Sequence, residues 1–178
     1  MADSNSNTEL KEPIKVTDLD PEFKYEIAKT DEGRTILYCY QCGTCSSSCQ
    51  SACADLYPHQ IIRMALLGLK KEVLNSKSIW ICTTCYDCIE RCPQGVEVAN
   101  VLFAIKNIAV TKKIIPRGFK IFAKTIFGTG RGAEITDMQE DERDDLDLPP
   151  VPKVDKEAIK KMLKKVEFDE IIESKEGD

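Results

Sequence analysis

Two runs of four cysteines with the same internal spacing constrain this chain more than any other feature of its sequence. In each run two residues separate the first three cysteines from one another, and three residues separate the third from the fourth. The runs are Cys39, Cys42, Cys45 and Cys49, and then Cys82, Cys85, Cys88 and Cys92. All nine cysteines of the 178-residue chain lie between Tyr38 and Gly95, so we expect this stretch to contain the functional site.

This spacing is typical of thiolates that bind iron–sulfur clusters. In bacterial-type ferredoxins the same run supplies ligands to one [4Fe–4S] cluster, and its fourth cysteine binds the other cluster. Three thiolates spaced by two residues wrap three corners of a cubane, whereas the fourth points toward the neighbouring cubane. The sequence therefore predicts two [4Fe–4S] clusters, with the ligands Cys39, Cys42, Cys45 and Cys92 for the first and Cys82, Cys85, Cys88 and Cys49 for the second.

Zinc is the main alternative, because it also binds thiolates in closed tetrahedral sites. Zinc sites take their cysteines in pairs, and the third cysteine of each run has no natural place in such a pair. The ninth cysteine, Cys53, is either an unligated thiol or a replacement for Cys49 as the crossing ligand. Spacing favours Cys49, although Gln50 follows it where Pro93 follows the fourth cysteine of the second run.

Composition and patterning exclude several classes of protein. The first thirteen residues contain no apolar signal, and the nearly apolar segment 98–105 is far too short for a transmembrane segment, so we expect a cytoplasmic protein. In that reducing compartment clustered cysteines indicate metal or redox chemistry rather than disulfides. The net charge of −5 argues against nucleic acid as a partner.

Helical periodicity dominates the chain, and strand signals are nearly absent. One helix is expected from Pro58 through the apolar face that ends at Leu69, a second from just past Gly95 to about Lys113, and a shorter one over 119–127. We predict a mainly α fold, with an α-helical ferredoxin-like domain over residues 21–132 and both clusters in loops between helices.

The remaining segments differ in composition from this domain. Residues 1–20 are polar and predict a flexible N-terminal arm. Seven acidic residues between Asp137 and Asp147, followed by prolines, predict a solvated, extended linker over 133–153. An amphipathic pattern from about Asp155 to Glu173 predicts a helix within a C-terminal segment 154–178.

Charge and histidine content add two weaker indications. Residues 98–133 contain seven Lys or Arg and no carboxylate, which indicates either a solvated face or a surface that docks on an acidic partner protein. Lys112 and Lys113, with Phe119 and Phe122 as apolar anchors, form the predicted partner surface. His59 is the only histidine, and we expect a surface or capping role for it.

Residues 35–116 resemble the C subunit of heterodisulfide reductase, the small iron–sulfur subunit of methanogenic archaea. The resemblance rests on the sequence from Cys39 to Cys49, the helix over 61–69, the sequence from Ser78 to Pro93, and Gly95-Val-Glu-Val with its trailing helix. The domain is also similar to the α-helical ferredoxin module of the succinate dehydrogenase iron–sulfur subunit. Gln50 and Cys53 depart from the pattern.

The resemblance implies a relay subunit without catalytic residues of its own. Electrons would pass from an A-like flavin and iron–sulfur subunit, through the two clusters, to a B-like catalytic subunit that reduces the CoM-S-S-CoB heterodisulfide of methanogenesis. A hydrogenase or formate dehydrogenase module would feed the larger complex. The competing interpretations are a relay subunit of a sulfur-oxidation or glycolate-type oxidoreductase, a free ferredoxin, and a zinc-binding interaction module.

Overall fold

The computed structural model describes residues 14–173, and this part of the chain is helical, with no strand. This confirms the predicted mainly α fold. The elements up to the second cysteine run are the 3-10 helices η1 (Val16–Asp18), η2 (Ile36–Tyr38), η3 (Ala52–Ala54) and η4 (Lys77–Ile81), and the α-helices α1 (Phe23–Ala28), α2 (Thr44–Ser47), α3 (Pro58–Leu66) and α4 (Lys70–Asn75). The remaining elements are α5 (Asp87–Glu90), α6 (Val98–Thr111), α7 (Arg117–Thr129), α8 (Asp137–Asp145), α9 (Lys156–Lys165) and α10 (Phe168–Glu173).

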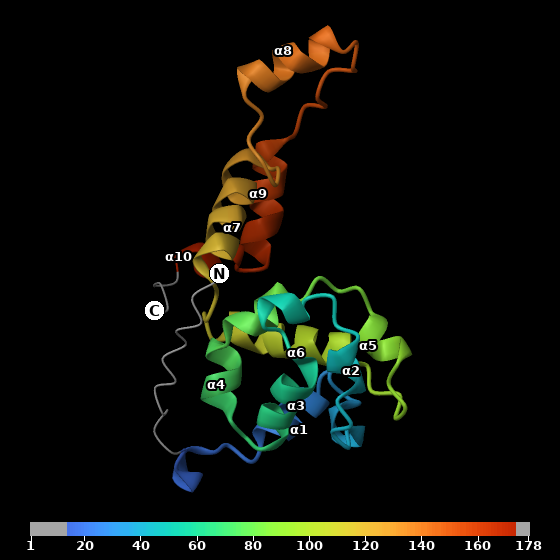
Figure 1. Ribbon diagram of the computed structural model, residues 1–178. Helices are drawn as coiled ribbons and strands as arrows, with labels where there is room; N and C mark the ends of the chain where they lie inside the picture. Colours follow the sequence, from blue (N-terminus) through green and yellow to red (C-terminus); the bar gives the residue numbers. More distant parts are fainter. Residues whose placement is uncertain (1–13, 174–178) are drawn as a thin grey trace, which may run out of the picture.

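Helix α6 runs through the middle of the cysteine-containing domain (Figure 1). Its apolar residues recur at helical spacing, and Val101, Leu102 and Ile105 are buried against the surrounding helices. Helices α1, α4 and α5 all pack on α6, and α3 packs on α1 and α4. Pro58 occupies the first turn of α3, where its missing N–H costs no hydrogen bond. Helices α3 and α6 supply half of the buried core residues on which the cysteine loops rest.

The segment before α1 is fixed to the start of α4. The Asp20 N–H donates to the Gly68 carbonyl at 2.8 Å, and Lys70 Nζ donates to the Asp20 carboxylate at 3.0 Å. Lys70 also pairs with Glu26 and lies 5.4 Å from the centre of the Phe23 ring. Asp20, at the end of the predicted flexible arm, is therefore anchored, whereas residues 1–13 of that arm lie outside the described residues.

Helices α7, α9 and α10 pack on one another and extend away from the cysteine-containing domain (Figure 1). The helix expected over 119–127 is present as the longer α7. The expected helix over 155–173 is divided into α9 and α10, with Glu167 at a left-handed φ of 56° at the break. Within residues 14–173, no helix is both long and apolar enough to cross a membrane.

The extended linker predicted over 133–153 is wrong for its central part, which forms α8. A capping-box sequence at Thr136 and Gln139 explains the difference, because the Gln139 Oε1 accepts a hydrogen bond of 3.0 Å from the Thr136 backbone N–H at the start of the helix. Asp137 and Glu140 in the first turn interact favourably with the helix dipole. These local interactions fold a segment that buries none of its residues.

Candidate iron–sulfur centres

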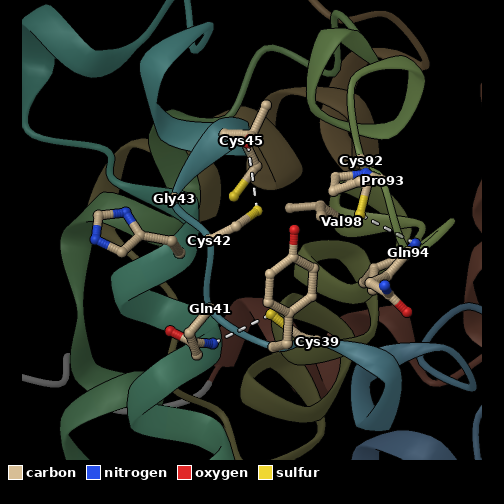
Figure 2. Close-up of a pocket in the computed structure, with 13 residues that line it drawn as sticks. Cys39, Gln41, Cys42, Gly43, Cys45, Cys92, Pro93, Gln94 and Val98 are labelled. Carbon is tan, nitrogen blue, oxygen red and sulfur yellow. Dashed lines mark hydrogen bonds between the residues drawn. The ribbon is translucent and has the colours of Figure 1, made fainter.

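Four cysteines surround one cavity between the loop before α2 and the loop before α6. Figure 2 shows the sulfur atoms of Cys42 and Cys45 near one another, with those of Cys39 and Cys92 on other sides of the same space. The cavity has a volume of about 330 Å³, part of it open to solvent, and Val96 and Val98 form an apolar part of its wall. We call it the first cavity.

The other four cysteines of the two runs surround a second cavity of about 320 Å³. They are Cys82, Cys85, Cys88 and Cys49. Leu56, Ala99 and Leu102 supply the apolar part of its wall. Each cavity thus takes three cysteines from one run and the last cysteine from the other run, which is the arrangement that crossed ligation requires.

The two cysteine loops have the same backbone form. Gln41 and Gly43 have positive φ angles of 69° and 80°, and Thr84 and Tyr86, at the equivalent positions of the second run, have φ angles of 61° and 63°. A short helix follows each loop, α2 in the first and α5 in the second. Three of the four left-handed residues are not glycine, and residues with a side chain adopt this conformation less readily than glycine does. The shared form turns the first three thiols of each run toward a common space.

Within each loop the three cysteines differ in depth. The thiols of Cys45 and Cys88 are buried, whereas Cys42 and Cys85 are exposed at the surface. Burial raises the pKa of Cys45 to about 11 and that of Cys88 to about 12. Iron must therefore displace protons from these buried thiols when it binds.

Hydrogen-bond donors point at sulfur atoms of the first cavity. The Gln41 side-chain amide donates to Cys39 Sγ at 3.2 Å (Figure 2), and the Val96 backbone N–H donates to Cys92 Sγ at 3.2 Å. Hydrogen bonding with Thr44, whose Oγ1 lies 3.3 Å from Cys42 Sγ, lowers the pKa of the Cys42 thiol. Donors of this kind stabilise the negative charge on cluster-bound sulfur and tune its potential.

The sulfurs of each cavity surround a space rather than a point. In the described part of the chain, no three Cys, His, Asp or Glu side chains are arranged to hold a single metal ion. A cubane places its four ligands at the corners of a body that fills such a space. The thiol sets of both cavities, together with the donors to sulfur at the first, therefore fit a [4Fe–4S] cluster in each.

The structure also places the residues outside the predicted ligand sets. Cys53 is exposed, and its Sγ lies 3.6 Å from the Gln50 carbonyl oxygen, outside the wall of either cavity. His59 is half-buried and lines the first cavity, with its Nδ1 2.7 Å from Ser46 Oγ. Nothing in the residue pattern indicates this position of His59 beyond its place at the start of a helix.

The residues of the predicted partner surface differ in their surroundings. Lys112 is exposed, whereas Lys113 Nζ lies 3.4 Å from the Glu170 carboxylate of α10. The Phe119 ring packs 5.0 Å from that of Trp80, which leads into the second cysteine run, and Phe122 is about half exposed. The role of these residues in binding a partner stays a prediction.

Comparison with known proteins supports the chemistry of the cavities. A family model described as a 4Fe-4S dicluster domain matches residues 35–96, a stretch that includes all eight cysteines of the two cavities. The chain therefore contains iron–sulfur clusters and is an electron-transfer subunit.

Relatives that match over most of their length come from methanogenic archaea. The iron-sulfur C subunit of the CoB–CoM heterodisulfide reductase of Methanopyrus kandleri is 34% identical, over 93% of this chain and 94% of the relative. The C subunit of the H(2):CoB-CoM heterodisulfide,ferredoxin reductase of Methanothermobacter marburgensis is 36% identical, over 89% of each chain. The C subunit of the Ferredoxin:CoB-CoM heterodisulfide reductase of Methanosarcina mazei is 33% identical, over 80% of this chain and 92% of the relative. Since these matches cover most of the length of both proteins, this chain belongs to the family of heterodisulfide reductase C subunits.

Proposed function

We propose that this chain relays electrons through two [4Fe–4S] clusters, from an A-like flavin subunit to a B-like subunit that reduces the CoM-S-S-CoB heterodisulfide. Cys39, Cys42, Cys45 and Cys92 would hold one cluster, and Cys82, Cys85, Cys88 and Cys49 the other. The observation that carries the proposal is the pair of four-thiol cavities built on loops of the same backbone form. When bound, such clusters supply reversible one-electron transfer.

The two cavities lie next to each other across the starts of two helices. In α3, Pro58 lines the second cavity and the next residue, His59, lines the first. In α6, Val98 lines the first cavity and Ala99 lines the second. Adjacent residues therefore separate the two sites at both places, and an electron has a short path between them.

The wall residues favour a relay over a catalytic role. Four cysteines at each cavity would bind all four irons of a cubane, and this leaves no open iron position for a substrate. Leu56, Leu102 and Val98 exclude water from the inner side of the sites. Cys42 and Cys85 lie at the surface, where a redox centre of a neighbouring protein can approach.

We also propose a larger complex that includes a hydrogenase or formate dehydrogenase module. The support comes from a relative in Methanococcus maripaludis, named as the C2 subunit of an H(2)/formate:CoB-CoM heterodisulfide,ferredoxin reductase, which is 36% identical over 75% of this chain. Nine clustered thiols favour the reducing cytoplasm as the compartment.

Anaerobic purification of the tagged full-length chain from its own cells tests the relay. We expect the A-like and B-like subunits to co-purify, and the clusters of this chain to be oxidised when heterodisulfide is added to the reduced complex. Purification of the chain alone, with clusters that heterodisulfide does not oxidise, would support a free ferredoxin instead.

A further inference from the structure

Helix α6 places a lysine beside the second cavity. Ala99 and Leu102 line that cavity, and Lys106 lies on the same face of the helix, one turn beyond Leu102. Lys106 Nζ lies 3.5 Å from the backbone carbonyl oxygen of Cys82, which begins the second cysteine run. The ammonium group also lies 5.1 Å from the centre of the Phe103 ring. These contacts hold a positive charge close to one wall of the second cavity.

Lys106 is half-buried, so water screens its charge less than that of a surface lysine. Along α6 it lies between the buried residues Leu102 and Ala109. A cation in such a place is costly unless a nearby negative charge compensates it. A cluster with four thiolate ligands is anionic, and it would supply that negative charge.

The first cavity has a different set of neighbours. No Lys, Arg, Asp or Glu is among the residues that line either cavity, and the side-chain donor to sulfur at the first is the neutral amide of Gln41. The second cavity has one opposing charge nearby, since Asp87 precedes Cys88. The Asp87 carboxylate accepts a hydrogen bond of 3.4 Å from the Gln50 amide. The two sites therefore differ in the charged groups beside them, since Lys106 contacts the Cys82 carbonyl at the second site, whereas Arg91 and Glu97 adjoin Cys92 and Val98 in the chain at the first.

We propose that Lys106 selectively raises the reduction potential of the cluster in the second cavity. Reduction adds one electron to the cluster, without forming or breaking a bond to the protein, and so increases its negative charge. A fixed cation nearby stabilises that charge more than it stabilises the oxidised cluster. When one electron is shared between the two clusters, Lys106 thereby favours its location on the cluster in the second cavity. This inference rests on the proposed function.

A redox titration of the full-length chain, followed by electron paramagnetic resonance with dithionite as the electron donor, tests the role of Lys106. In Lys106→Gln we expect the second-cavity cluster to reduce at a lower potential, with a smaller shift at the first. Lys106→Met repeats the measurement with a neutral side chain that keeps most of the stem. Lys106→Arg keeps the charge and should stay close to the native potential. The exposed Lys71, on α4, provides the matched control Lys71→Gln, for which we expect no shift.

The two signals are assigned with Cys85→Ser, for which we expect a large change in the spectrum of the second-cavity cluster and a smaller one in the other. Equal shifts of both clusters in the neutral variants, or no shift in either, would overturn the role of Lys106 while two clusters remain. A chain that binds only one cluster would instead overturn the proposed function, and iron analysis of the same samples distinguishes these results.

Discussion

At the scale of single residues, three non-glycine residues of the cysteine loops have backbone φ angles that residues with a side chain rarely adopt. Gln41, Thr84 and Tyr86 all have φ angles between 61° and 69°. Each such residue costs on the order of 1 kcal/mol in free energy of folding. The cost recurs at the same places in both loops, where it directs the thiols toward one cavity. We infer that cluster binding, rather than local preference, stabilises these conformations.

The crossing ligand of the second cavity gives a prediction at this scale. Cys49 lines the cavity, whereas Cys53 is an exposed thiol outside it. We expect Cys49→Ser to lower the iron content from about eight to about four per chain, or to leave one altered cluster. Cys53→Ser is the matched control and should keep the native iron content and spectrum. The opposite result would show that Cys53 is the ligand.

Spacing predicted two sets of four thiols, and the same sets line the two cavities, while their role as cluster ligands stays a prediction. It could not predict the neighbours that tune the site. Gln41 reaches Cys39 from a left-handed backbone, and Lys106 reaches the Cys82 carbonyl because α6 packs against that loop. Such contacts depend on tertiary packing, which residue types alone do not reveal.

At the scale of elements, a glycine in the turn between α3 and α4 allows the N-terminal segment to pack closely against that turn. Gly68 has a φ of 83°, and a Cβ atom there would lie 2.5 Å from the Asp20 carbonyl oxygen. We expect Gly68→Ala to lower the free energy of unfolding by about 3 kcal/mol, from backbone strain and this clash together. Thermal unfolding of the cluster-loaded chain checks this, and we expect a lower midpoint temperature for the variant.

Gly95 provides the control for this prediction. Its φ is also positive, at 63°, but a Cβ atom there would meet nothing within 4 Å. Gly95→Ala should therefore show only the cost of the left-handed backbone, about 1 kcal/mol. Equal losses of stability in the two variants would contradict the close approach of Asp20 to Gly68.

Among the elements, helices with an apolar stripe were predictable and helices without one were not. The periodicity of α3 and α6 reflects the core that they share, so it is visible in the sequence. Helix α8 buries no residue and is stabilised by the cap at Thr136. Its acidic composition predicted a linker instead of a helix. Helices α2 and α5 have only four residues each, too few to show a period.

At the scale of the whole molecule, the basic stretch after α6 offers a surface for a partner protein. Lys112, at the end of α6, and Phe122, within α7, are both exposed. We expect the double variant Lys112→Glu with Phe122→Ser to weaken binding to the A-like and B-like subunits at least about tenfold, since it removes an apolar anchor and reverses a charge. Co-purification and iron content are measured together.

The control for this test is Lys71→Glu, which reverses an exposed charge on α4. Lys113 is less suitable as a target, because its pair with Glu170 joins the end of α6 to α10 and its reversal would also disturb the chain's own helices. Undiminished co-purification of the double variant, with native iron content, would remove this surface from the interface.

Iron and acid-labile sulfide analysis of the anaerobically purified chain is the most direct test of the central claim, that eight thiols in two cavities hold two cubanes. We expect about eight irons and eight sulfides per chain, with little zinc, and paramagnetic signals of two interacting clusters on reduction. About four irons per chain, or zinc in place of iron, would contradict this claim.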